Sequence, residues 1–178
     1  APVSLDDGLD TSQRLAQMAH DPDPFTRWEA GQSIARAIMV GRNTESTSAL
    51  IEALNRELDR AQEDPAFAAL AFRLPDLSEL LLASEPPDPE ALYAAREKLR
   101  RAVATALKDR LVPLARAKGE TPFSPSAAAA GQRALKSVAL HLLASLGDEC
   151  ADLLADSYRE AQSMTESMAA LEALSASG

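Results

Sequence analysis

Apolar residues recur every three or four positions over most of the chain, which is the spacing of one face of an α-helix. Phe25, Trp28, Gly31, Ala35 and Ile38 form the first clear stripe. Comparable stripes cover residues 50–58, 67–81, 92–106, 135–146, 150–161 and 168–174, and a short helix is expected over residues 10–19. The pattern therefore predicts about eight helices.

Signals for helix starts and stops divide these stripes. Four starts combine a capping oxygen with a proline, whose missing N–H has no intrahelical partner at the first helical position. They are Asp23-Pro24, Asp64-Pro65, Asp88-Pro89 and Ser124-Pro125. Three glycines are expected to end helices in the left-handed conformation. They are Gly41, Gly119 and Gly147. Asp148 and Thr165 are expected to cap the last two helices.

The longest helix is expected to start at Asp88. Its apolar positions, from Leu92 to Ala106, should face inward. Its basic residues should stay solvated; these are Arg96, Lys98, Arg100 and Arg101. Glu97 is expected to pair with Arg101 one turn later. Pro113 cannot donate to the carbonyl of Asp109, so a kink or a break is expected there.

Helices joined by short loops favour antiparallel neighbours in a layered stack. Ala and Leu dominate the composition, Val and Ile are few, and aromatic residues make up 4%. Such a chain has few residues suited to strands, which argues against all-β and doubly wound α/β folds. No repeat of fixed length is visible. We therefore predict an all-α, irregular helical-repeat superhelix over residues 10–178, similar to an ARM/HEAT α-solenoid, after an extended segment at residues 1–9.

Charge and cysteine content restrict the partners of the chain. Its 18 basic and 27 acidic residues give a net charge of −9, which argues against nucleic acid and anionic membranes as partners. No run of 18 apolar residues and no signal peptide is visible, so no membrane span is expected. The one cysteine cannot form an internal disulfide, so stability must come from packing.

The residues that could carry chemistry are sparse and scattered. His20 and His141 are the only histidines, and neither belongs to a helical H-E-x-x-H zinc motif. A metal site built from His20, Asp21 and Asp23 with a distant partner is the weaker interpretation, because turn and cap chemistry explains these aspartates. His141 lies beside the leucine stripe of its helix, where a structural role is favoured over proton transfer.

The remaining candidates also favour structural roles. Cys150 lies on an apolar stripe, as a small buried residue does. Two acidic pairs occupy positions typical of solvated helix faces and caps; they are Glu29 with Asp59 and Glu149 with Asp152. No G-x-S-x-G turn and no glycine-rich phosphate loop is present. We therefore assign no catalytic, cofactor-binding or metal-binding residue in this chain.

Several stretches nevertheless resemble a known family when they are taken together. Residues 25–32 read Phe-Thr-Arg-Trp-Glu-Ala-Gly-Gln and resemble the stretch that opens the C-terminal helical domain of bacterial aminopeptidase N, the alanyl aminopeptidase family of zinc peptidases. Four further stretches match in the same order. They are residues 70–75, Asp88-Pro89 with residues 95–99, residues 133–136, and residues 163–166 with 169–171. In residues 163–166, Ser and Glu replace the Asn and Asp of the family.

The resemblance implies a role for the chain within a larger enzyme. Family members remove N-terminal residues from peptides with one zinc ion, and their helical domain helps to enclose the substrate chamber. No catalytic or zinc-binding residue of the family maps onto this chain. The resemblance thus implies a non-catalytic first part of the C-terminal domain in a cytoplasmic enzyme. Its partners would be the catalytic and β-sandwich domains of the same polypeptide, and residues 1–9 resemble the end of that β-sandwich.

Two alternatives stay open from the residues alone. The first is a freestanding helical-repeat adaptor whose concave face binds a peptide or a protein. The second is a stand-alone hydrolase that uses His141 or Cys150, although no base, orienting group or oxyanion donor stands at a recognisable spacing. An upstream H-E-x-x-H segment in the gene would favour the peptidase, whereas an open reading frame starting near Ala1 would favour the adaptor.

Overall fold

The computed structural model describes residues 7–119 and 122–177. In this part of the chain there are nine α-helices and no strand. The helices are α1 (Thr11–His20), α2 (Pro24–Met39), α3 (Thr47–Arg60), α4 (Pro65–Ala71), α5 (Leu77–Leu82), α6 (Pro89–Ala115), α7 (Ala127–Ala144), α8 (Ala151–Arg159) and α9 (Met164–Ser175). Two short 3-10 helices, Thr44–Ser46 and Gly147–Glu149, precede α3 and α8. The predicted all-α fold class is confirmed.

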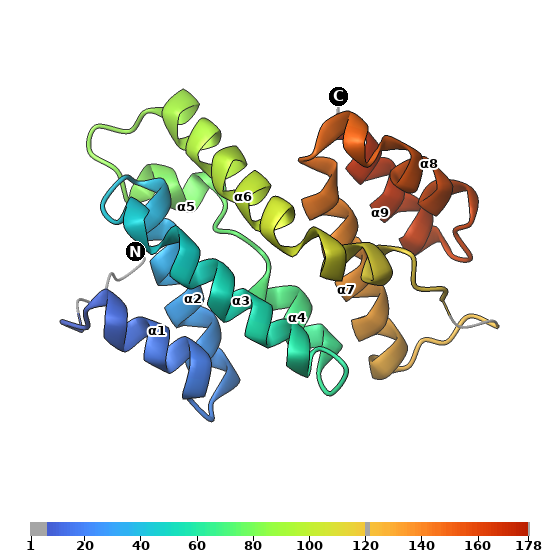
Figure 1. Cartoon of the computed structure of the whole chain (residues 1–178), viewed down its shortest axis with the longest axis horizontal. Coiled ribbons are helices and arrows are strands. Elements are labelled where there is room, and N and C mark those ends of the chain that lie inside the picture. Colours follow the sequence, from blue (N-terminus) through green and yellow to red (C-terminus); the bar gives the residue numbers. More distant parts are fainter. Residues whose placement is uncertain (1–6, 120–121, 178) are drawn as a thin grey trace.

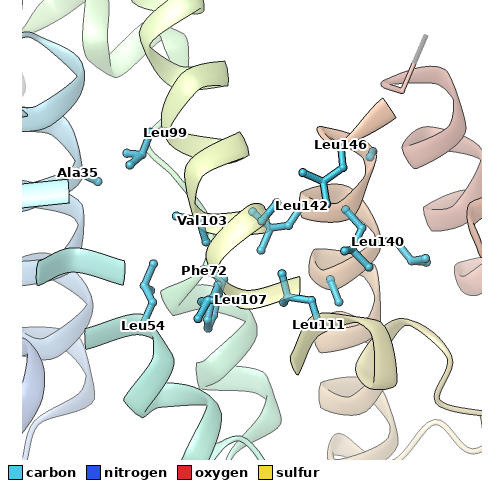
Figure 2. Packing of buried hydrophobic residues seen from close by; sticks show 14 of the residues in the cluster. Ala35, Leu54, Phe72, Leu99, Val103, Leu107, Leu111, Leu140, Leu142 and Leu146 are labelled. Carbon is cyan, nitrogen blue, oxygen red and sulfur yellow. The ribbon is translucent and has the colours of Figure 1, made fainter. Parts of the chain in front are cut away.

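The long helix α6 lies between two groups of helices. Figure 1 shows α1 to α5 on one side of it and α7 to α9 on the other. Leu99, Val103, Leu107 and Leu111 follow one another along α6, and Figure 2 shows them between the side chains of the two groups. Each is at most 4% exposed. Full burial of such a side chain stabilises a fold by about 1.5–3 kcal/mol, so α6 joins both groups into one core.

Three of the four predicted helix starts are confirmed. The carboxylates of Asp23, Asp64 and Asp88 accept hydrogen bonds from the N–H groups three residues later, at 2.8, 2.9 and 3.0 Å. The helix start predicted at Ser124-Pro125 is wrong, because the N-cap of α7 lies two residues later. There Ser126 accepts from the N–H of Ala129 at 3.2 Å and a run of alanines follows, which favours helix more strongly than the proline does.

The helix stops and the later caps follow the prediction less closely. Gly41 and Gly147 have positive φ after α2 and α7, as expected. Gly119 does not. Asp148 lies inside a 3-10 helix, and Cys150 takes the N-cap position of α8 without a capping side chain. The cap of α9 is Ser163, not Thr165, because the Ser163 hydroxyl accepts from the N–H of Glu166.

Pro113 does not break α6. The helix continues through it to Ala115, and the ribbon in Figure 1 changes direction in its yellow C-terminal section rather than ending there. Leu111 and Ala115 flank the proline and are each 1% exposed. Their packing holds the last turn in place and offsets the lost hydrogen bond to Asp109, which costs about 3 kcal/mol in an unadapted helix.

Some expected inward positions face solvent. Ala106 is exposed, whereas Ala104 and Leu107 are buried. Phe25 is 67% exposed, and the buried side of α2 begins at Ala30. On α9, Met168 and Leu171 are exposed, and Ala170 and Ala173 face the core instead. No described helix combines the length and the apolarity needed to cross a bilayer.

The predicted N-terminal segment at residues 1–9 falls largely outside the described residues. Residues 7–10 have no regular structure and lead into α1. Asp10 and Gln13 form a capping box at the start of that helix, in which each side chain binds the backbone N–H of the other residue. The first helix therefore begins at Thr11, close to its expected start at about Asp10.

Candidate functional site

The two histidines lie in separate surface cavities. His20, at the end of α1, lines a cavity with residues of α2, α3 and α4, whereas His141 lines another between α6 and α7. No group of three or more His, Cys, Asp or Glu side chains in residues 7–119 and 122–177 is placed to hold a metal ion. The weaker interpretation of His20 with Asp21 and Asp23 therefore gains no support from the described residues.

Cys150 is buried at the start of α8 and is 3% exposed. Burial raises the pKa of its thiol because it penalises the thiolate; Lys108 opposes this effect and Glu149 adds to it. The thiol is therefore held in its unreactive, protonated form. Cys150 packs with the main core, so the predicted buried position is confirmed.

Two of the four acidic residues singled out in the sequence, Asp59 and Glu149, form ion pairs with basic residues of α6. Asp59 contacts Arg110 Nη2 at 2.8 Å, which joins α3 to α6. Glu149 contacts Lys108 Nζ at 2.5 Å, and this hydrogen bond raises the pKa of Lys108. These contacts connect neighbouring helices at the surface, where ion pairs contribute about 0–1 kcal/mol to stability.

The cavity beside His141, which we call the α6–α7 pocket, has a volume of about 270 Å³. Four segments meet there: the turn after α4, and the helices α6, α7 and α9. The polar lining consists of Arg73, Asp76, Arg96, Arg100, Ser137, His141 and Glu172. Apolar lining comes from Phe72, Leu74, Val138 and Leu142. Sequence reasoning did not bring these residues together, because they come from segments up to a hundred positions apart.

The turn that forms one wall of this pocket is held by two side chains. Gln32 Nε2 of α2 donates to the carbonyl of Arg73 at 2.7 Å. Arg96 Nε of α6 donates to the carbonyl of Pro75 at 3.0 Å. Because Pro75 ends the apolar run of residues 67–74, its carbonyl has no helical partner, and Arg96 supplies one. Gln32 belongs to the sequence stretch that carries the family resemblance.

Arg100 lines the pocket and is buried, whereas the sequence predicted that it would stay solvated. The residue is only 7% exposed. Arg100 Nη2 contacts Glu97 Oε2 at 2.6 Å, so Glu97 pairs with Arg100 and not with Arg101 as expected. The prediction was wrong because α6 is packed on both sides, which widens its buried face beyond the single stripe of Leu92, Leu99 and Val103.

His141 completes this polar cluster across the α6–α7 contact. Its Nε2 lies 3.2 Å from Arg100 Nη1, an arrangement in which a neutral imidazole accepts from the guanidinium. Desolvation lowers the pKa of His141, and Arg100 and Arg96 lower it further. The histidine is thus neutral near pH 7 and holds Arg100 in position. A structural role was predicted, but its partner was not visible in the sequence.

The second cavity lies beside the stretch of residues 25–32. Arg27 stacks over the ring of Phe67, 4.4 Å from its centroid, and its Nη1 donates to the carbonyl of Asp21 at 3.2 Å. Arg27 Nε lies 3.9 Å from Oε1 of Glu57, a residue of α3 that is 3% exposed. Desolvation raises the pKa of Glu57, although Arg27 and Arg60 oppose the shift.

A buried pair joins α7 to α9. Lys136 Nζ contacts Glu166 Oε1 at 3.0 Å, and Glu166 Oε2 accepts from the N–H of Gln162 at 2.8 Å. Gly119 passes beside this carboxylate, and a Cβ at that position would lie 2.9 Å from Glu166 Oε1. Close approach, not a left-handed conformation, is therefore the reason for glycine at position 119.

Comparisons with known proteins identify relatives over the whole helical part. The family described as "Domain of unknown function (DUF3458_C) ARM repeats" matches residues 11–178. Aminopeptidase N of Caulobacter vibrioides is 37% identical over 189 residues, covering 100% of this chain and 21% of that protein. Aminopeptidase N of Escherichia coli K12 is 30% identical over 182 residues, covering 97% of this chain and 21% of that protein.

A solved structure shares the fold. The crystal structure of Legionella pneumophila aminopeptidase A in complex with aspartic acid matches with a TM-score of 0.77 and 23% identity. The match covers 94% of this chain and 21% of that one. The chain thus spans about a fifth of the length of the relatives it matches, and the resemblance to aminopeptidase N seen in its sequence is confirmed.

Proposed function

We propose, on the premise that this chain belongs to the DUF3458_C family of ARM-repeat domains, that it is a non-catalytic helical segment of an aminopeptidase N-type enzyme. In this proposal the complete enzyme releases N-terminal amino acids from peptides. The segment forms the first part of a C-terminal helical domain and shapes the chamber that peptides enter. The observation that carries the proposal is that the whole chain aligns with only a fifth of each aminopeptidase N relative.

Zinc, in this proposal, is bound by another part of the polypeptide. A catalytic zinc site needs three protein ligands, typically His, Glu or Cys side chains that converge on one point. The described residues do not fit the ion, because they contain no such convergent group and the two histidines line separate cavities. In this proposal the chain itself performs no chemical step. Its contribution is steric and electrostatic, and its acidic surface suits the free amino termini of peptides.

The exposed face of α9 supports a partner within the same polypeptide. Met164, Met168 and Leu171 lie three or four residues apart on one side of this helix and are 77%, 46% and 44% exposed. Helices in repeat stacks bury both faces between neighbours, and only capping repeats have a polar outer face. We propose that further helices of the parent enzyme cover this side of α9. The β-sandwich contact of residues 1–9 and a cytoplasmic location are parts of the same proposal and rest on the family resemblance.

The proposal is tested with two polypeptides, the isolated chain and the complete product of the open reading frame that encodes it. Each is assayed for hydrolysis of aminoacyl 4-nitroanilides with added Zn²⁺. We expect turnover by the complete product only, and its loss on chelation serves as the control. Metal-dependent turnover by the isolated chain would overturn the proposal. So would an open reading frame that starts near Ala1 and encodes no H-E-x-x-H segment.

The freestanding adaptor is not favoured. A composition rich in Ala and Leu is common to helical scaffolds of many functions. The relatives of this chain, in contrast, are aminopeptidases that align over 97–100% of its length. The stand-alone hydrolase gains no support either, since Cys150 is buried with a raised pKa and His141 contacts Arg100 rather than a nucleophile.

A further inference from the structure

The charged groups of the α6–α7 pocket fall into two sets. Arg100 and Arg96 contact Glu97, at 2.6 and 3.6 Å. In the described part of the chain, no ion pair within 4 Å involves Arg73, Asp76 or Glu172, although all three line the cavity and are exposed. Charged side chains of both signs that lack a close ion-pair partner therefore line the same small cavity.

We propose that this pocket binds a free α-amino acid as its zwitterion. In this arrangement the carboxylate lies between Arg73 and Arg96, and the ammonium group lies toward Asp76 and Glu172. A simple anion would meet the two acidic groups, and a simple cation would meet the arginines. Only a ligand that carries both charges satisfies both sets.

The carboxylate side is pre-arranged by the fold. The hydrogen bond from Arg96 Nε to the carbonyl of Pro75 fixes the direction of its guanidinium, whose planar fork suits a carboxylate. Beneath it, Arg100 is buried and shares its single acidic partner, Glu97, with Arg96. Because these two arginines share one carboxylate, a bound carboxylate beside them would gain a favourable contact.

The size and the apolar wall of the pocket limit the ligand to a small one. Its volume of about 270 Å³ is close to the lower limit of small-molecule sites, which is roughly 300 Å³. Phe72 and Leu142 are 3% and 2% exposed and form a fixed apolar surface beside the polar groups. Leu74 and Val138 extend this surface and are half-buried. An aliphatic amino acid such as leucine matches both the size and the chemistry.

The binding test compares three probes with the isolated chain. They are L-leucine, 4-methylpentanoate, which lacks the amino group, and 3-methylbutylamine, which lacks the carboxylate. Titration calorimetry and two-dimensional NMR report saturation and the affected residues. We expect saturable binding of leucine with shifts near Ser137 and Ala169, and roughly tenfold weaker binding of each analogue, since each loses a charge-assisted contact. Equal affinity for 4-methylpentanoate, or no saturable binding of leucine, would overturn the proposal.

Two variants locate the site, and a third serves as the matched control. Arg73→Ala removes a positive charge from the lining of the pocket, and Glu172→Gln removes a negative charge from it. Neither side chain has a hydrogen bond or ion pair in the described residues, so both variants should fold. Each is expected to weaken leucine binding by roughly tenfold. Arg116→Ala removes an exposed arginine that does not line the pocket, and the affinity for leucine should stay unchanged. Wild-type affinity in both pocket variants would refute the assignment. The result is independent of the proposed function, because no peptide hydrolysis is measured.

Discussion

The α2–α4 region and the α7–α9 region each bury one carboxylate almost completely, and they satisfy it in different ways. Glu166, in the second region, receives Lys136 Nζ at 3.0 Å and the N–H of Gln162 at 2.8 Å. Glu57, in the first, has its nearest cations at 3.5 and 3.9 Å, on Arg60 and Arg27. The pKa of Glu57 is raised because desolvation outweighs these longer contacts.

The difference arises from what else each cation must contact. Lys136 is free to reach one acceptor across the α7–α9 interface. Arg27 also stacks on Phe67 and donates to the carbonyl of Asp21, and its Nε has no hydrogen-bond partner in the described residues. In this protein the buried carboxylate is therefore better compensated where its cation contacts no other group. This contrast predicts that substitution of Glu166 destabilises the protein more than substitution of Glu57.

The largest effect is expected for Glu166→Ala. The substitution leaves the largely buried Lys136 without a counter-ion and the Gln162 N–H without an acceptor, which should cost about 3–5 kcal/mol of unfolding free energy. Urea denaturation followed by circular dichroism measures the loss. Glu172→Ala, an exposed acid on the same helix, is the control and should change stability by less than about 0.5 kcal/mol. Similar values for the two variants would contradict the compensation inferred for Glu166.

A smaller loss is expected for Gly119→Ala, which tests the same pair without removing a charge. The new Cβ would lie 2.9 Å from Glu166 Oε1, so either the carboxylate or the loop must shift. Overpacking of this kind costs about 1–3 kcal/mol. Gly41→Ala cannot serve as the control, because that glycine has positive φ. Ala117→Gly in the same loop is the better comparison, and a Gly119→Ala protein as stable as the wild type would show that the loop yields freely.

Glu57→Gln is expected to change stability at pH 7 by about 1 kcal/mol or less, because the charge it removes is poorly compensated. Its pH dependence is more informative. The folded pKa of Glu57 is raised above 4.5, so the wild type loses stability as the pH rises from 4.5 through the folded pKa. The difference between wild type and variant, measured by urea unfolding between pH 4 and pH 7, should follow this trend. A difference independent of pH would show that Glu57 is fully compensated.

The smallest effect is expected at His141, between the two regions, and it has the opposite pH trend. The folded pKa of His141 is lowered below 6.5, so its contribution is present above pH 6.5 and is lost as the pH falls through the folded pKa. His141→Gln keeps an acceptor for Arg100 and removes the titration. The wild type should therefore lose stability relative to this variant on acidification below pH 6.5. Parallel pH curves would exclude His141 as the titrating group.

The sequence alone determined the class of the fold and several of the element boundaries. Asp23, Asp64 and Asp88 cap helices in the structure as predicted, because a capping oxygen followed by proline acts within one turn of chain. Gly41 and Gly147 end helices for an equally local reason. The resemblance carried by residues 25–32 and four further stretches also indicated the family of the chain, and the relatives confirm it.

The tertiary structure alone decided which polar side chains are buried and what they contact. Arg100 was expected in solvent, but α6 is covered on two sides and the residue meets Glu97 and His141. Pro113 was expected to kink or break α6, and packing at Leu111 and Ala115 keeps the helix continuous through it. The α6–α7 pocket is formed by four segments that are distant in the chain, and no local sequence pattern predicts that they come together. Short-range chemistry sets where helices begin and end, whereas the burial of a charge depends on every helix that packs around it.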